Sequence, residues 1–437
     1  MVNYFRAWYY LRSMMRRAYW PRNKLTKYQN EKLREIVKYA WNNVPFYHEK
    51  FREAGVKPTD IKTIEDLSKL PIIRKDDIKR NGIRMISREY DIAKLRKLRT
   101  SGSTGEPLFF YISGKEDEFR KAKHLRANIA CGQRPRDKWV AITSPPYFSQ
   151  ATKLQRLLGI YAPVSVSVFD DVVNQISIIE KLRPDVLDGY GSSLLLLARE
   201  IEKMGIDTIK PRLLLSGADL IGPRSRHFVE NVFGAPLYDQ YSSAEFERLA
   251  WQCKEKNGYH IDADSVIMEF VDENGENVAP EEAGEIVCTS LFNRAMPLIR
   301  YALNDLGKAS DEGLCPCGRT FPLMKVIEGR KDDVIVLPDG RAMSSLAFIV
   351  AMYDLSFYKD IEKFRVIQKR VNHFKFLIKL RNREVYNEES IKAEMVAHFS
   401  KVLMIDANEM NFDIELTNEI PLDKSGKFRI VISELKK

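Results

Sequence analysis

The sequence predicts an α/β protein in which a large N-terminal α/β domain with covered sheets precedes a small α+β domain. Two observations predict this organisation. From Lys138 onward, helical segments such as Ser193 to Met204 alternate with short strand-like runs, namely WVAIT, VSVSVF and DVLDGY. After Arg330 the pattern changes, because the strand-like runs FRVIQ, FKFLIKL and FDIEL surround one amphipathic helix around Glu388 to Val402. We therefore expect two domains, residues 1–330 and residues 331–437.

The segment before these strands has helical periodicity. Apolar residues recur at helical spacing between Lys24 and Glu53, and the pattern ends at Gly55. The first 20 residues combine aromatic and arginine residues in a helix-compatible stretch. Two interpretations of that stretch stay open. It packs onto its own domain or onto a second subunit of a homodimer, or it makes peripheral contact with an anionic membrane surface.

The composition is that of a globular protein. Of the 437 residues 44% are hydrophobic, but no apolar run approaches the ~20 residues that cross a bilayer. The N-terminus alternates aromatic and basic residues and lacks the apolar core of a secretory signal. We expect a cytoplasmic protein, with the inner face of the membrane as a finer alternative, and therefore five reduced cysteines rather than a disulfide framework. The net charge is +10. Because the basic residues are interspersed with acidic ones, we expect an ordinary solvated surface and no nucleic-acid partner.

A loop rich in glycine and hydroxyl residues, TSGSTGEP, is the strongest local signal. Glycine permits turns that aim successive backbone amides at one anion, and the hydroxyls add donors, so the loop predicts a polyphosphate site. Its members are Thr100, Ser101, Gly102, Ser103, Thr104 and Gly105. A solvated Ser/Gly linker is the alternative. The loop is not a Walker sequence, because no Gly-Lys-Ser/Thr closes it. The apolar run Leu108 to Tyr111 follows, so we expect the loop to connect elements of a sheet.

Five further motifs follow in a fixed order, namely LLLSGADL, YSSAEFERLA, PLIRYALNDLG, GRKDDVI and PLDKSGKFR. With the glycine-rich loop, they resemble the adenylate-forming enzymes over essentially the whole chain. The runs YAWNNVPFYHEKFREAG, LPIIRKDDI and CPCGRT narrow the resemblance to the phenylacetate-CoA ligase branch and its CapK-like members, which are found with surface-polysaccharide genes.

The resemblance implies a nucleotide site for ATP. The glycine-rich loop would cradle the β- and γ-phosphates, and Tyr241 would stack on adenine. Asp305 would accept hydrogen bonds from the ribose, and Arg330 would contact ribose or phosphate. Ser216, Gly217 and Ala218 would line the site, although a tight turn explains them equally well.

Glu245 matches the family glutamate, whose expected role is to bind Mg²⁺. The alternative is a helix-opening carboxylate on a solvated face. Relatives usually carry a hydroxyl residue before this glutamate, whereas this chain has Ala244 there. Two interpretations stay open: Ser242 or Ser243 replaces that hydroxyl, or the α-phosphate is bound more weakly. A second departure is Ala302 to Asn304, where relatives commonly carry a Thr/Ser-Gly pair before the aspartate.

Lys427 matches the catalytic lysine that contacts the α-phosphate and the carboxylate during adenylation, where its charge offsets the negative charge of the transition state. An ordinary lysine of the C-terminal tail is the alternative. A lysine on a small domain must move in for the first half-reaction and out for the second, so we expect residues 331–437 to be mobile. Asp332 matches the hinge position.

Four residues form a candidate zinc site. Two cysteines in a C-x-C pair share a tetrahedral ion when two more N or S ligands fold nearby, and some relatives in the phenylacetate branch hold zinc at similar places. The four are Cys253, His260, Cys315 and Cys317. Unligated thiols in a packed core are the alternative. We expect Cys131 and Cys288 to be buried thiols and the other histidines, His124 among them, to be structural or exposed.

The sequence therefore predicts an ATP- and Mg²⁺-dependent ligase that activates a small-molecule carboxylic acid as an acyl-adenylate. The acceptor stays open between CoA and an amine or hydroxyl group on a sugar, the latter in capsule or O-antigen assembly. Tyr147 and Phe148 are candidates for the acyl pocket. A different class of function is a nucleotide-binding scaffold or regulatory subunit that has lost catalysis, which the alanine at position 244 supports.

Overall fold

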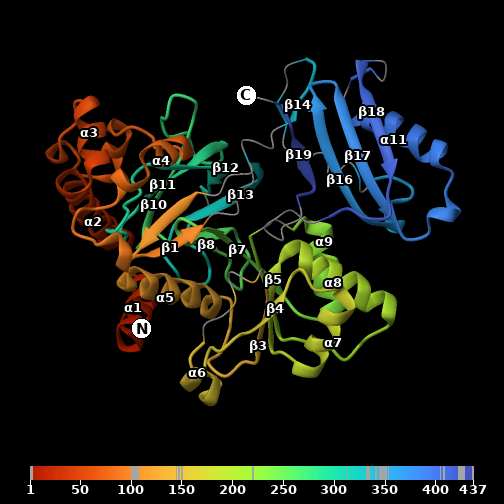
Figure 1. Cartoon of the computed structure of the whole chain (residues 1–437), viewed down its shortest axis with the longest axis horizontal. Coiled ribbons are helices and arrows are strands. Elements are labelled where there is room, and N and C mark those ends of the chain that lie inside the picture. The colour runs from red at the N-terminus through yellow and green to blue at the C-terminus, as the bar shows by residue number, and fades with distance from the viewer. Residues whose placement is uncertain are drawn as a thin grey trace. The chain divides into compact units, whose positions relative to one another are not determined.

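The computed structural model describes residues 3–99, 108–143, 145, 148, 151–218, 221–311, 313–330, 335–339, 342–343, 352, 354–403, 405–406, 409–421 and 429–435. The chain divides into two compact units (Figure 1). The first comprises Met1–Leu303 and Gly307–Val326, and the second comprises Asn304–Leu306 and Ile327–Lys437.

The first unit contains most of an 11-stranded sheet of order β10-β11-β12-β13-β9-β8-β7-β6-β5-β3-β4. Only Asn304–Leu306 of β12 and the end of β13 from Ile327 are assigned to the second unit. Strands β4, β3, β5, β6 and β7 are parallel to one another, whereas β8 runs antiparallel to both β7 and β9. The strands are β3 (Trp139–Thr143), β4 (Val164–Ser167), β5 (Val186–Tyr190), β6 (Leu213–Gly217), β7 (Leu237–Ser243), β8 (Glu247–Trp251), β9 (Tyr259–Ile261), β10 (Val266–Val271), β11 (Gly284–Ser290), β12 (Tyr301–Ala309) and β13 (Leu323–Arg330).

Helices cover the parallel half of this sheet. Helices α7 (Val172–Leu182), α8 (Gly191–Met204) and α9 (Pro223–Phe233) follow β4, β5 and β6 in the chain. Buried strand residues such as Leu187 and Leu214 share one apolar cluster with helix residues such as Ile179 and Leu197. Because such strands are buried on both faces, they read as continuous apolar runs, which explains why the sequence predicted them.

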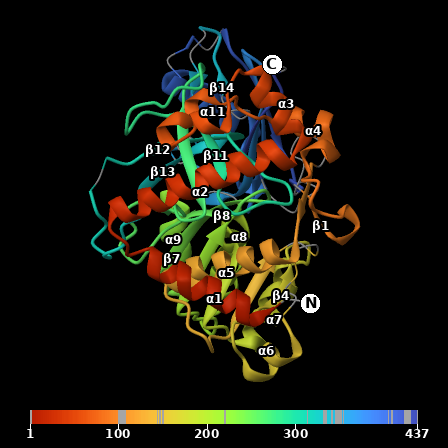
Figure 2. The same ribbon diagram turned by 90° about the vertical axis from the view of Figure 1, so that its left-hand side faces the viewer.

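The N-terminal helices are α1 (Tyr4–Arg17), α2 (Arg22–Asn43), α3 (Pro45–Glu53) and the short α4 (Lys75–Asn81), and Figure 2 shows them on one side of the first unit. The sequence suggested one helical segment from Lys24 to Glu53, whereas the structure has two helices there. Val44 takes the extended conformation between them, because Pro45 lacks an N–H and restricts the residue before it.

Two further elements flank the glycine-rich loop. Strands β1 (Arg96–Arg99) and β2 (Phe109–Ile112) pair antiparallel, so the loop connects two strands as expected, while its own residues lie outside those described. Helix α5 (Gly114–Ala130) follows β2. Its N-cap is Ser113, which accepts a hydrogen bond from the N–H of Glu116 in a capping box. Helix α6 (Lys153–Leu158) follows β3.

The second unit is a smaller α+β body. Its four-stranded sheet has the order β18-β17-β16-β19, and buried apolar residues of these strands and of helix α11 share one cluster. The elements are β14 (Ile335–Val336), β15 (Ala342–Met343), β16 (Ile361–Arg370), β17 (His373–Leu380), α11 (Glu388–Leu403), β18 (Asn411–Leu416) and β19 (Val431–Ser433). The strand-like runs and the amphipathic helix of the sequence correspond to β16, β17, β18 and α11.

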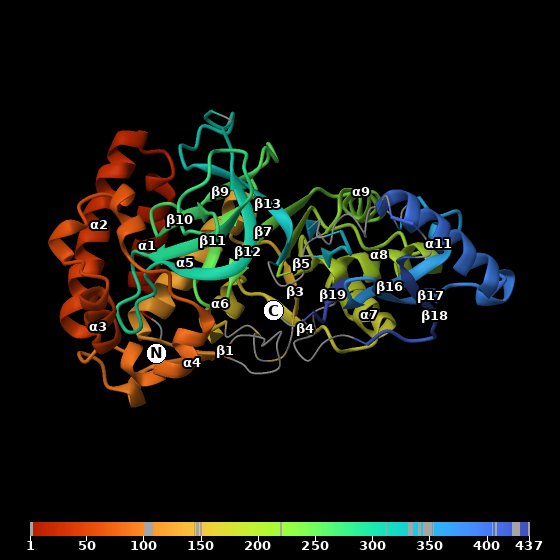
Figure 3. The ribbon, with the colours of Figure 1, turned by 90° about the horizontal axis from the view of Figure 1, so that it is seen from above.

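None of the helices that the structure describes is both long enough and apolar enough to cross a bilayer. Figure 3 shows the same elements from above.

Candidate active site

The turn between β7 and β8 carries the predicted glutamate. In the parallel pairing of β6 and β7, Ser216 lies opposite Asp239 and Gly217 opposite Gln240. Strand β7 therefore continues past the last residue of β6 through Tyr241, Ser242 and Ser243. The carboxyl end of parallel strands is where α/β proteins bind ligands, so this register brings the two predicted nucleotide segments to the same edge.

Glu245 lies inside the protein rather than on a solvated face. Only 7% of it is exposed, and its Oε1 accepts a hydrogen bond from the hydroxyl of Tyr301 at 3.3 Å. The main chain of the turn is held from helix α5, because Arg120 donates to the carbonyl oxygens of Ala244 at 2.8 Å and of Glu245 at 2.9 Å. Lys123 donates to the next carbonyl, that of Phe246, at 3.2 Å. Three consecutive carbonyls of one turn are thus fixed by two buried cations.

The two serines beside the turn are already engaged as acceptors. The hydroxyl oxygen of Ser243 accepts from the N–H of Phe246 at 3.2 Å, and that of Ser242 accepts from Nη1 of Arg248 at 3.2 Å. Because a hydroxyl also carries one hydrogen, each serine retains a donor for an anion. Both therefore fit the role that the sequence assigned to them in place of a hydroxyl at position 244.

The end of β6 combines a buried hydroxyl with two unusual backbone positions. Ser216 is buried and donates to Oδ1 of Asp239 at 2.6 Å, so its hydroxyl proton is used in a hydrogen bond between β6 and β7. A Cβ at Gly217 would lie 3.3 Å from both Nη1 of Arg248 and the carbonyl oxygen of Gln240. Ala218 has a φ of 69°, in the left-handed region. Glycine at position 217 therefore permits a close approach of β6 to β7 and to Arg248.

A cluster of charged side chains beside this edge escaped the sequence analysis. Nδ1 of His124 lies 3.1 Å from Oε1 of Glu247 and 3.3 Å from Nη2 of Arg248. Burial would raise the pKa of Glu247, but His124, Arg120 and Arg248 outweigh burial and lower it. The sequence analysis expected His124 to be structural or exposed and did not identify its carboxylate partner, Glu247. No local pattern could reveal it, because the two residues are 123 positions apart.

Burial raises the pKa of the Asp188 carboxyl on β5, although Arg248 and His124 oppose the shift. The aspartate, the middle residue of β5, therefore lies in the same electrostatic environment as His124 and Arg248.

The other predicted nucleotide residues are placed only in part. Asp305 lies in β12 directly after Asn304, which has a φ of 62°. This conformation is one that glycine adopts readily, and asparagine is among the few other residues that tolerate it. Arg330 is the last residue of β13, and only its main chain is described. Residues 100–105, Tyr147, Asp332 and Lys427 lie outside the described residues. Phe148 is described and is 38% exposed.

The residues on either side of Lys427 are held by strand β16. Arg365 donates through Nε to the carbonyl of Arg429 at 3.0 Å and through Nη2 to the carbonyl of Pro421 at 2.9 Å. Lys363 donates to the carbonyl of Ile420 at 2.8 Å. A single guanidinium therefore joins the two ends of segment 422–428, which carries the lysine.

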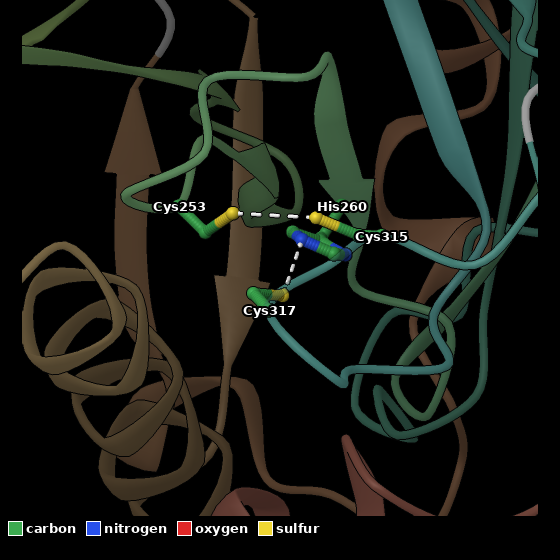
Figure 4. A group of neighbouring side chains, drawn as sticks. All are labelled: Cys253, His260, Cys315 and Cys317. Atoms are coloured by element: carbon green, nitrogen blue, oxygen red, sulfur yellow. Dashed lines mark hydrogen bonds between the residues drawn. The ribbon is translucent and has the colours of Figure 1, made fainter.

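The cysteines and the histidine predicted for zinc come together (Figure 4). Cys253 follows β8, His260 lies in β9, and Cys315 and Cys317 lie in the loop between β12 and β13. Their four ligand atoms all lie within 4.8 Å of one another. The Sγ atoms of Cys253 and Cys315 are 3.6 Å apart, and Sγ of Cys317 is 3.4 Å from Nε2 of His260.

This cluster has the donors and spacing of a tetrahedral zinc site. With Zn–S bonds of about 2.3 Å, the edges of such a tetrahedron are about 3.8 Å long. Burial lowers the pKa of His260 to about 4, so the imidazole is neutral near pH 7 and offers a lone pair. Cys131 and Cys288 are buried thiols, as expected.

Comparison with known proteins decides the family. The phenylacetate-coenzyme A ligase of Thermus thermophilus is 30% identical over 330 residues, which cover 72% of this chain and 73% of that protein. The chain belongs to the phenylacetate-CoA ligase family. It is an adenylate-forming ligase, and the resemblance inferred from its motifs is confirmed.

Other comparisons extend the match of this phenylacetate-CoA ligase family member to the second unit. Protein CapK of Staphylococcus aureus is 24% identical over 430 residues, 95% of this chain and 90% of CapK. The family model for the CapK C-terminal domain matches residues 336–434. A crystal structure of 2-hydroxyisobutyryl-CoA ligase with R3-HIB-AMP superposes with a TM-score of 0.79, at 21% identity, over 96% of this chain and 91% of that one. The likeness confirms the predicted fold class.

Proposed function

We propose that this ligase uses ATP and Mg²⁺ to activate a small carboxylic acid and then transfers the acyl group to CoA. In the first step a carboxylate oxygen attacks the α-phosphorus of ATP, and pyrophosphate leaves. In the second step the thiol sulfur of CoA attacks the acyl carbon, its proton is lost to a base, and AMP leaves. Both partners of the first step are anions, so the site must neutralise charge and hold an in-line geometry.

The observation that carries this proposal is the position of Glu245. A carboxylate is a hard oxygen donor of the kind that Mg²⁺ prefers. Glu245 is buried at the sheet edge where α/β proteins bind ligands, in a turn whose carbonyls Arg120 holds. A glutamate with an ordinary surface role would not need its main chain fixed by a buried guanidinium.

The remaining roles are assigned from the motifs. Residues 100–105 would hold the β- and γ-phosphates, with Ser242 and Ser243 as further donors. Tyr241 would stack on adenine, Asp305 would bind the ribose, and Arg330 would contact ribose or phosphate. Lys427 would neutralise the α-phosphate and the carboxylate. In this proposal the small domain, residues 331–437, moves about Asp332 between the two half-reactions.

The CoA acceptor is favoured by the similarity to a protein named phenylacetate-coenzyme A ligase. An amine or hydroxyl group on a sugar is the second candidate. It is favoured by the second unit, because residues 336–434 match the CapK C-terminal domain. On that alternative the chain would join an acid to a saccharide in capsule or O-antigen assembly.

Loss of catalysis is a competing proposal, in which the chain is a nucleotide-binding scaffold. Ala244 supports it, because relatives commonly carry a hydroxyl residue there. The hydroxyls of Ser242 and Ser243 weaken that support, since each keeps a hydrogen to donate.

We further propose a structural zinc ion at Cys253, His260, Cys315 and Cys317. Three sulfurs and one nitrogen are a donor set that zinc prefers in closed structural sites. The site would tie the β8–β9 hairpin to the loop before β13, at the end of β8 opposite to Glu245.

The first experiment is carboxylate-dependent ATP-pyrophosphate exchange over pooled aryl acids, fatty acids, amino acids and uronic acids. Lys427→Ala is the control. Exchange that requires one pool and collapses in the variant supports adenylation and identifies the class of acid. CoA, amines and sugars are then supplied as acceptors. ATP binding without exchange in any pool would favour the scaffold.

A further inference from the structure

The outer face of helix α1 is a stripe of aromatic and basic side chains. Phe5 is 89% exposed, Trp8 57% and Tyr9 65%. Arg12 and Arg16 are also exposed, and the Arg12 guanidinium lies 5.3 Å from the Trp8 ring centre. These positions are three and four residues apart, so they lie on one side of the helix. An exposed face with this much aromatic surface marks an interaction site.

The opposite face of α1 fixes the helix to the protein. Met14 is fully buried, and Tyr10 packs edge-on against Phe119 and Phe292. Arg6 forms an ion pair with Glu118 of α5 at one end. At the other end Arg17 pairs with Asp264 at 2.6 Å. The packing onto its own domain that the sequence left open is therefore present, and it holds the outer face in a fixed orientation.

Helix α6 adds a second apolar and basic element. Leu154, Leu157 and Leu158 are 63%, 82% and 48% exposed, with Lys153 and Arg156 exposed among them. In Figures 1, 2 and 3, α6 lies near the N-terminal end of α1. Neither helix contains an aspartate or a glutamate, although acidic residues are interspersed with basic ones in most of the chain.

We propose that the exposed residues of α1 and α6, called here the α1–α6 surface, bind the anionic surface of a lipid bilayer. Aromatic and leucine side chains beside arginines are the composition of segments that lie in the headgroup region. The absence of acidic residues from both helices matches a negatively charged partner. Each Arg or Lys near such a surface strengthens binding about fivefold. The surface is independent of the proposed chemistry.

The test is flotation of the full-length protein with lipid vesicles. One set contains phosphatidylcholine alone, and the other contains equal amounts of phosphatidylcholine and phosphatidylglycerol. We expect the protein to float only with the anionic vesicles, and less at high salt. The double variants Phe5→Ser/Trp8→Ser and Arg12→Gln/Arg16→Gln should each lose most of this binding. Ile83→Ser is the matched control, because Ile83 is an apolar residue with 67% exposure on another element.

Sedimentation velocity and pyrophosphate exchange accompany the flotation. Unchanged exchange in the variants shows that they fold. The proposal is overturned if the protein does not float with anionic vesicles at low salt, or if the double variants float as well as Ile83→Ser. It is also overturned if Phe5→Ser/Trp8→Ser dissociates a dimer without altering flotation, because the surface would then bind a second copy of the chain.

Discussion

Nη1 of Arg120 lies 2.9 Å from the main-chain oxygen of Glu245, although 125 positions separate the two residues in the chain. The same guanidinium reaches the carbonyl of Ala244 and, at 3.3 Å, the carboxylate of Glu247. Arg120 on helix α5 thus fixes the main chain of Glu245 and makes no contact with the Glu245 carboxylate among the hydrogen bonds described. This relationship makes Arg120 a positioning residue.

Replacing Arg120 by alanine should slow pyrophosphate exchange. Hydrogen bonds to charged groups contribute about 1.5–3 kcal/mol, which corresponds to a loss of roughly 10- to 100-fold if the turn shifts. The melting temperature should also fall, because two carbonyls lose their donor. Arg96→Gln is the control, since its pair with Asp117 is nearly half exposed on the arginine side and such pairs contribute little. Exchange at the wild-type rate in Arg120→Ala would contradict the positioning role.

Glu245→Gln should lower exchange by roughly 100-fold or more, the effect of removing one well-placed electrostatic group. The Mg²⁺ concentration needed for half-maximal rate should rise, because an amide binds the cation more weakly than a carboxylate. A Mg²⁺ titration of the exchange rate measures both effects. Glu276→Gln, at an exposed position, should leave the titration unchanged. An unaltered Mg²⁺ requirement in Glu245→Gln would remove the residue from the metal site.

Arg365→Gln should also reduce exchange, because this side chain holds the carbonyls of Pro421 and Arg429 on either side of Lys427. If Arg365 acts through the lysine, the double variant with Lys427→Ala should be no slower than Lys427→Ala alone. Lys369→Gln, which breaks a surface pair with Glu434, is the control. Additive losses in the double variant would show that the two residues act separately.

The metal content of the purified protein tests the cysteine and histidine cluster. We expect about one zinc ion per chain by elemental analysis, the content of a single four-ligand site. Cys253→Ser should lose the ion and melt at a lower temperature, since structural zinc contributes to folding. Cys288→Ser, which alters a buried thiol outside the cluster, should retain it. Equal zinc in both variants, or none in the wild type, would exclude the site.

The partly buried Lys363 makes the stability of the second unit depend on pH. Burial, with help from Arg365 and Lys379, lowers the pKa of Lys363 from 10.5 to about 8. Between those values the unfolded chain binds more protons at this lysine than the folded chain does, so its contribution to the free energy of unfolding rises with pH. Below about pH 8 both states are protonated, and the full cost of burying the charge remains.

The measurement is the melting temperature of the second unit's transition at pH 8 and at pH 10, in the wild type and in Lys363→Met. The melting temperature of the wild type minus that of Lys363→Met should be larger at pH 10 than at pH 8. Lys369→Met, an exposed substitution, should not change with pH in this way. A wild-type minus Lys363→Met difference that is constant with pH would mean that Lys363 keeps its ordinary pKa.

The sequence by itself determined the family and most of the elements. Strands β3, β5 and β6 are short apolar runs because both of their faces are buried, and motifs such as the Cys315-x-Cys317 pair mark chemistry with residues close in the chain. The helix break at Val44 is encoded locally, because Pro45 imposes it. The sequence analysis nevertheless missed it, since the apolar periodicity continues across the break.

Only the tertiary structure decided which distant side chains meet. The clamps made by Arg120 and Arg365 and the contact of His124 with Glu247 join residues that are dozens to more than a hundred positions apart. Arginines on a helix or strand look alike in a sequence whether they face water or a buried carbonyl. Hydrogen bonds and ion pairs depend on distance and on burial in space, and only packing of the whole domain sets these.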